Sequence, residues 1–177
     1  MKIEPTDHIR HITVKELMKR YRNAERFIDC CRQCSSYGHQ WNCPPFSFDP
    51  GEILSSLNHA EIIATTITLP RTDTPLSEAD QILLPERLRL EKMLIEKEQT
   101  LGGRSFATIG RCHHCPGQTC TRPEGLPCRH PQLVRPSLEA FGFDITAILA
   151  DLFNLTLTWG TQGHCPSPLT LVTAHMR

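Results

Sequence analysis

The sequence has no apolar run long enough to form a membrane-spanning helix, which needs about 20 predominantly apolar residues. Its longest uncharged apolar-rich stretches, residues 62–70 and 152–160, are short and rich in threonine. The first residues also lack the apolar stretch that a secretory signal peptide requires. We therefore expect a cytoplasmic protein without a membrane segment.

A net charge of either sign is also absent, because lysine plus arginine and aspartate plus glutamate both total 19. The overall charge thus gives no reason to expect nucleic acid or an anionic membrane as a partner. Locally, the segment from Arg104 to Arg135 contains five arginines and one acidic residue, Glu124. These arginines are predicted to offset the negative charge of a metal–thiolate centre, and a solvated basic loop is the alternative.

Common catalytic motifs are missing as well. The sequence contains no phosphate-binding loop, no Gly-x-Gly-x-x-Gly, no Gly-x-Ser-x-Gly and no His-Glu-x-x-His. The Cys-x3-Cys-x2-Cys arrangement of radical enzymes that use S-adenosylmethionine is absent too. Since no general acid or base can be chosen, the sequence alone predicts no reaction.

Cysteine, by contrast, is abundant, with nine residues in 177. Cys112, Cys115, Cys120 and Cys128 are separated by two, four and seven residues, and most of the residues between them are polar, glycine or proline. Clustered thiols in a reducing compartment usually bind metal. Four thiolates in one loop can ligate one tetrahedral zinc ion or one 4Fe-4S cluster.

A second group of thiols, Cys31, Cys34 and Cys43, lies about 80 residues earlier. It provides three ligands, and the fourth is Cys30, is Cys165 from a distant loop, or is absent. An incomplete set of thiolates would leave one iron open to a small ligand and so suited to act as a Lewis acid.

The spacing of the cysteines matches neither the bacterial nor the plant-type ferredoxin pattern. Proline follows three of the cysteines directly, which favours irregular loops around a cluster, and we expect 4Fe-4S with zinc as the alternative. A mixed cysteine and histidine zinc site is a further alternative. Its candidate histidines are His39, His113, His114 and His164.

Hydrophobic periodicity predicts one α+β domain spanning residues 1–177, with a small sheet of about four strands covered by helices and two cysteine-rich metal-binding loops. Pro70 is expected to end a strand, Pro85 to begin or kink a helix, and Gly102 to end it. The expected helices are 14–27, 52–59, 76–101 and 144–153, and the expected strands are 60–69, 104–109, 155–159 and 169–173.

Residues 31–45 follow the pattern Cys-x-x-Cys-x-x-Tyr-Gly-x-x-Trp-x-Cys-Pro-Pro, and the later cysteine loop is followed by Ser-Leu-Glu-Ala-Phe-Gly-Phe-Asp-Ile at 137–145. Together these motifs resemble the family of predicted metal-binding proteins, domain of unknown function 2284, over nearly the whole chain. The resemblance implies metal binding and no established reaction, and it does not support Cys30 as a ligand. We interpret Glu139 as a surface residue, and a helical turn that places it near the metal site is the alternative. The ligands that the resemblance implies are Cys31, Cys34, Cys43, Cys112, Cys115, Cys120 and Cys128.

Three hypotheses follow. The first is a 4Fe-4S protein that transfers electrons or serves a redox partner protein. The second is a structural zinc-binding module for protein interaction. The third is a metalloenzyme with an open iron at the three-cysteine site. None of them includes nucleic acid or a membrane as a partner.

Overall fold

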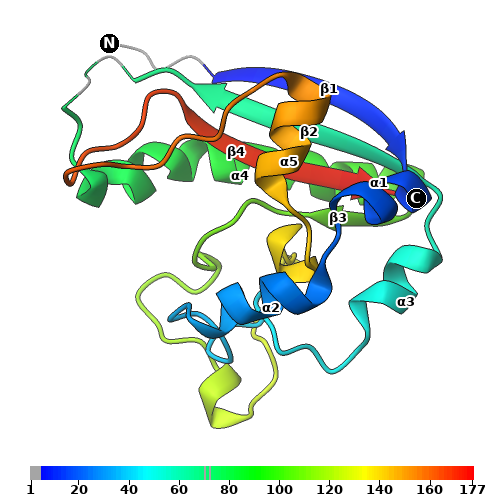
Figure 1. Cartoon of the computed structure of the whole chain (residues 1–177). Coiled ribbons are helices and arrows are strands. Elements are labelled where there is room, and N and C mark those ends of the chain that lie inside the picture. The colour runs from blue at the N-terminus through cyan, green and yellow to red at the C-terminus, as the bar shows by residue number, and fades with distance from the viewer. Residues whose placement is uncertain (1–4, 70, 72) are drawn as a thin grey trace.

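A four-stranded antiparallel sheet forms the centre of the computed structural model, which describes residues 5–69, 71 and 73–177 (Figure 1). The strand order is β1-β2-β4-β3, and each neighbouring pair is antiparallel. The predicted α+β fold is therefore confirmed. The strands are β1 (Pro5–Thr13), β2 (His59–Ile67), β3 (Arg104–Phe106) and β4 (Leu169–Met176).

Helices cover both faces of this sheet. In Figure 1, α4 lies behind the sheet, and α5 and α1 lie in front of it. Among the described residues no helix is both long and apolar enough to cross a membrane. The α-helices are α1 (Val14–Tyr21), α2 (Ala24–Arg32), α3 (Pro50–Ser55), α4 (Ala79–Leu101) and α5 (Ile145–Phe153), and the 3-10 helices are η1 (Leu76–Glu78), η2 (Arg122–Glu124) and η3 (Glu139–Phe141).

The central strand β2 is buried on both faces. Successive strand residues point to opposite sides, so Ile62 packs into the cluster with α1 and α5, while Ile63 packs with Leu90 of α4. Each such buried aliphatic side chain contributes about 1.5–3 kcal/mol relative to an exposed one. Burial on both faces explains why this strand reads as a continuous apolar run.

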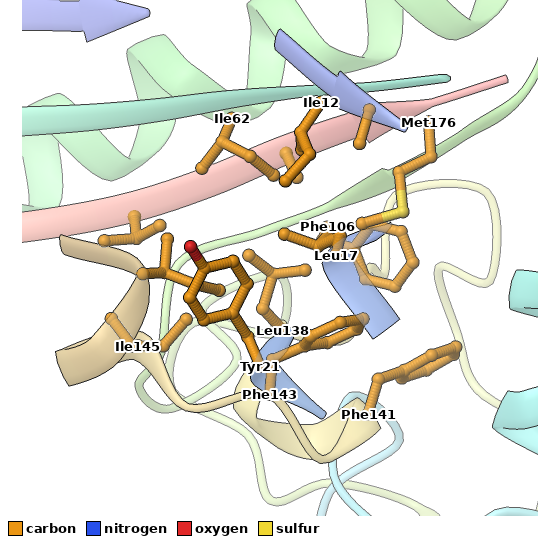
Figure 2. Close-up of a cluster of buried hydrophobic side chains, with 14 of the residues drawn as sticks. Ile12, Leu17, Tyr21, Ile62, Phe106, Leu138, Phe141, Phe143, Ile145 and Met176 are labelled. Atoms are coloured by element: carbon orange, nitrogen blue, oxygen red, sulfur yellow. The ribbon is translucent and has the colours of Figure 1, made fainter. Parts of the chain in front are cut away.

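The segment just before α5 is anchored in the larger cluster (Figure 2). Leu138, Phe141 and Phe143 are buried there, and the ring of Phe106 meets Phe141 edge to face at 5.0 Å between centroids. Asp144 caps α5 as predicted, since its side chain accepts a hydrogen bond from the amide of Ala147. This anchoring places η3 beside α2.

The predicted helix over residues 14–27 is two helices. The first ends at Tyr21, and Asn23 then starts α2 because its side chain accepts a hydrogen bond from the amide of Arg26. The amide of Asn23 donates to the carbonyl oxygen of Gly142, so the break also joins the chain to η3. After the break, α2 leads to Cys30 in its last turn.

One predicted strand is absent from the described residues, and one observed strand was not predicted. Residues 155–159 form no regular structure, and strand β1 was not expected. Only Ile12 of β1 is buried, so this edge strand lacks the apolar alternation from which strands are predicted. The strand expected over 104–109 ends at Phe106.

Helix boundaries differ in two places. The helix expected over 52–59 begins at Pro50 and ends at Ser55, because Asp49 caps it and β2 starts at His59. The long helix runs through Pro85 rather than starting there, and it ends at Gly102, whose positive φ of 70° suits glycine. Pro70 lies outside the described residues.

Candidate metal centre

The first cysteine group lies around one cavity. Cys31 is in the last turn of α2, Cys34 is in the turn that follows, and Cys43 comes shortly after. Cys30 joins these three in lining a cavity of about 540 Å³. The three predicted ligands and Cys30 thus border the same cavity, although no three of these four sulfur atoms lie within 4.8 Å of one another.

The second group lies around a separate cavity of about 440 Å³. All four of its thiols line this cavity, and all four residues are partly buried. The local spacing of the group makes this possible, because the chain turns repeatedly between them at glycines with positive φ, Gly117 and Gly125. The four residues are Cys112, Cys115, Cys120 and Cys128.

Cys165 lines neither of these cavities. It is buried in the apolar cluster with Leu90 and Leu171, and its thiol donates to the carbonyl oxygen of Pro75 at 3.3 Å. The suggestion that Cys165 supplies a distant fourth ligand is therefore not supported by its position. All nine cysteines are free thiols.

Backbone amides donate hydrogen bonds to sulfur in both groups. The amide of Ser36 donates to Sγ of Cys34 at 3.5 Å, and the amide of His130 donates to Sγ of Cys128 at 3.4 Å. Each donor lies two residues after its cysteine. Such bonds stabilise negative charge on sulfur and tune the potential of a metal cluster.

The thiols also raise one another's pKa. Burial, together with repulsion from Cys34 and Cys31, raises the pKa of Cys43 to about 11, although Arg122 opposes this. Burial likewise raises the pKa of Cys112, and the other cysteines of its loop add to the shift. A cation between the sulfur atoms would counter both the burial and the repulsion, so these donors fit a metal.

Arg122 of the second loop holds the backbone of the first. Its guanidinium group donates to the carbonyl oxygen of Gln40 at 2.5 Å and also to those of Cys43 and Pro45. The same group lies over the ring of Trp41, 5.4 Å from the centroid. One arginine thus fixes the segment that carries Cys43, which borders the other cavity.

Three further hydrogen bonds join the loops. The side-chain oxygen of Gln40 accepts from the amide of Cys112 at 2.7 Å, and Trp41 Nε1 donates to the hydroxyl of Thr121 at 3.2 Å. Asn42 Nδ2 donates to the carbonyl oxygen of Gly110 at 3.3 Å. The two cysteine loops are therefore one packed unit, although they are far apart in sequence.

Helix α4 supports both ends of the second loop. Arg87, which is buried, donates to the hydroxyl of Thr108 at 3.1 Å and to the carbonyl oxygen of Arg111 at 2.7 Å. At the far end, Glu98 accepts two hydrogen bonds from Arg135, at 2.8 and 2.5 Å. These contacts fix where the loop leaves β3 and where it returns to the core.

The arginines predicted to surround a metal centre have mixed roles. Arg111 lines both cavities and Arg129 lines the second. Arg104 lies over the ring of Phe141, while Arg135 binds Glu98. Charge compensation by these residues stays a prediction for the two that border the cavities.

The structure places Glu139 at the first cavity and not on the open surface. It lines the first cavity, and its Oε2 atom is buried without a hydrogen-bond partner among the described residues. Burial raises the pKa of this carboxyl group. The anchoring of Leu138 and Phe141 in the core places Glu139 beside the cavity, and this packing is not visible in the sequence.

Glu91 of α4 was not singled out from the sequence. Its Oε2 atom lies 2.8 Å from Nε2 of His113 and 3.6 Å from Nε2 of His114. Because Glu91 follows Arg87 by four residues, it looks like half of an ordinary surface ion pair. Of the other candidate histidines, His39 borders the second cavity and His164 lies in an exposed turn.

Comparison with known proteins gives one match. A family model described as Predicted metal-binding protein (DUF2284) matches residues 17–174, which include all nine cysteines. No curated protein and no solved structure matches the chain.

Proposed function

The chain belongs to this family of predicted metal-binding proteins, and we propose that it binds two 4Fe-4S clusters and transfers electrons to or from a partner protein. The observation that carries the proposal is the pairing of cavities and thiols, since each of the two cavities is lined by four cysteines. Cys112, Cys115, Cys120 and Cys128 would hold one cluster. Cys31, Cys34 and Cys43, with Cys30, would hold the other.

Both cavities have room for a cluster. They measure about 540 and 440 Å³, far more than the roughly 10–15 Å³ that one water-sized particle needs. The amide donors to Cys34 and Cys128 would also stabilise terminal thiolate ligands of such a cluster. When bound, a 4Fe-4S cluster supplies reversible one-electron chemistry.

The rim of the first cavity offers a place for the partner. Trp159 and Ile109 border this cavity, and they are 72% and 56% exposed. Electron-transfer encounters use small interfaces, for which a few apolar side chains are enough. We propose that the partner docks there and that both proteins act in the cytoplasm.

Purification without oxygen tests the cluster assignment. Iron, acid-labile sulfide and zinc are measured on the same sample, together with its absorption spectrum. We expect a brown protein with roughly eight irons and eight sulfides per chain, as two 4Fe-4S clusters require. A colourless protein without iron contradicts the proposal, and two tightly bound zinc ions would support the structural zinc alternative.

A second candidate function is a metalloenzyme that acts on a small molecule at the first cavity. Its size lies within the range of about 300–1,000 Å³ that is typical of small-molecule sites. Apolar residues such as Phe27 and Ile145 line it beside the buried carboxyl group of Glu139. Imidazole would bind an open iron and change the electron paramagnetic resonance spectrum of that cluster alone. An unchanged spectrum would favour electron transfer.

A further inference from the structure

Glu91 is a buried acidic residue whose partners are histidines and not lysine or arginine. The residue is 8% exposed, and within 4.0 Å its carboxylate meets no lysine or arginine side chain of the described residues. Its partners at that distance are the imidazoles of His113 and His114. Buried charges in proteins are generally paired or coordinate a metal, and imidazole is a common metal ligand.

The three side chains converge on one point. Oε2 of Glu91 lies 2.8 Å from Nε2 of His113 and 3.6 Å from Nε2 of His114, and one ligand atom from each residue lies within 4.8 Å of the other two. The two rings are tilted by 50° with centroids 4.6 Å apart, so they do not stack face to face. Both imidazoles are largely buried.

These distances suit a small divalent ion. Nitrogen and oxygen ligands at about 2.1 Å from a tetrahedral zinc ion lie roughly 3.4 Å from each other. The two separations from Glu91 bracket this value, and the ligand atoms of His113 and His114 lie within 4.8 Å of each other. Two imidazoles and one carboxylate are a common ligand set for zinc and for non-haem iron.

Space for a fourth ligand lies alongside. A void of about 10 Å³, close to the size of one water molecule, is lined by Glu91 and His114. Arg87 and Arg135 also line it, but their guanidinium groups are engaged with Thr108 and Glu98. A water molecule in this void would complete a tetrahedral shell.

We propose that Glu91, His113 and His114 form a third metal site, which binds one divalent cation of the zinc class through oxygen and nitrogen alone. Its donors include no sulfur, which distinguishes it from the proposed clusters, although His114 also borders the second cavity and Cys112 also borders the void. The ion joins α4 directly to the residues between Cys112 and Cys115, and it thereby fixes the position of two thiols of the second cavity.

Zinc binding to the anaerobically purified protein tests the site. Zinc is titrated calorimetrically into wild type, into Glu91→Gln and into Glu96→Gln, a matched change of an exposed glutamate on the same helix. We expect Glu91→Gln to weaken one equivalent of zinc more than about 100-fold, beyond the 10–100-fold cost of losing an outer-sphere partner. Glu96→Gln should bind zinc as wild type does.

X-ray absorption of the zinc-loaded protein identifies the ligands. We expect a zinc shell with nitrogen and oxygen at about 2.0–2.2 Å, distinct from sulfur at about 2.3 Å. A shell of sulfur alone, or equal zinc binding by wild type and Glu91→Gln, overturns the proposal and leaves a simple hydrogen bond between Glu91 and His113. His114→Gln is the second variant if Glu91→Gln does not fold, as judged by circular dichroism. Iron content, measured on the same samples, tests the cluster proposal independently.

Discussion

The guanidinium group of Arg122 donates a hydrogen bond to the backbone carbonyl oxygen of Cys43, 79 residues away in the sequence. The contact makes the first cavity dependent on the second loop. Any change that displaces η2, which contains Arg122, should therefore disturb a thiol to which it is not adjacent in sequence.

Replacing Arg122 should weaken both loops at once. The substitution Arg122→Gln removes bonds to three carbonyl oxygens, and we expect a loss of about 2 kcal/mol in the free energy of unfolding. Arg71→Gln is the control, since Arg71 is exposed, pairs with Asp73 and borders neither cavity. Thermal unfolding measures the loss of stability in each variant, and iron content measures the loss of bound clusters. Equal iron in both variants would show that the contact does not position Cys43.

Cys30 decides whether the first centre has four thiolates. Because Cys30 lines the same cavity as Cys31, we expect Cys30→Ser to lower the iron content and to change the resonance spectrum of one cluster. Cys165→Ser should keep all the iron but lower stability by about 1–3 kcal/mol, since it places a hydroxyl in an apolar cluster. Full iron with an unchanged spectrum in Cys30→Ser would instead favour an open iron.

The Glu98–Arg135 pair should make stability depend on pH. Burial alone would raise the pKa of Glu98, but hydrogen bonds from Arg135 and from the amide of Ser105 outweigh it and hold this pKa below 4.5. The stabilisation is therefore complete above pH 4.5 and is lost as the pH falls through the lower folded-state pKa. Glu98→Gln should cost about 2 kcal/mol at neutral pH.

Urea unfolding at several pH values checks the effect of Glu98. The difference in the free energy of unfolding between wild type and Glu98→Gln should disappear as the solution is acidified. Glu96→Gln, which changes an exposed residue of the same helix, should lie near wild type throughout. If the difference in the free energy of unfolding stays constant with pH, Glu98 acts by packing and not through its charge.

Glu139 should make the protein less stable as the pH rises, which is the opposite of the effect expected for Glu98. Burial raises its pKa above 4.5, so the folded state holds the charged form at a cost that grows as the pH rises above the unfolded value. We expect Glu139→Gln to stabilise the protein by on the order of 1 kcal/mol at neutral pH and to have little effect in acid. Glu124→Gln, at an exposed site, is the control. Destabilisation together with loss of metal would indicate that the carboxylate is a ligand.

The fold was predictable where the pattern is local. Strand β2 could be recognised because both of its faces are buried, and the start of α5 because Asp144 caps it. Strand β1 could not, since it is an edge strand with a single buried residue, Ile12. Residues 155–159 have strand-forming composition, but Leu155 and Leu157 pack on the core without pairing to a strand.

The candidate sites, like the fold, were predictable only where the pattern is local in the sequence. The spacing of the cysteines within each loop indicated two groups of thiols, because neighbouring ligands reach a common ion through local turns. The positions of Glu91 and Glu139 depend on contacts between elements that are distant in the sequence. Neither the residue type nor the spacing from the cysteines indicates that these two acids lie at a site. Only the packing of α4 against His113, and of η3 in the core, makes these acids notable.

Arg111 borders both cysteine cavities, so the two proposed cluster sites are neighbours. Charges in neighbouring sites influence each other through the Coulomb interaction, which grows as the distance between them falls. An electron added to one cluster would make the next electron harder to add to the other. A redox titration would then show two separate one-electron steps even if the clusters were chemically alike, and the protein would store electrons one at a time.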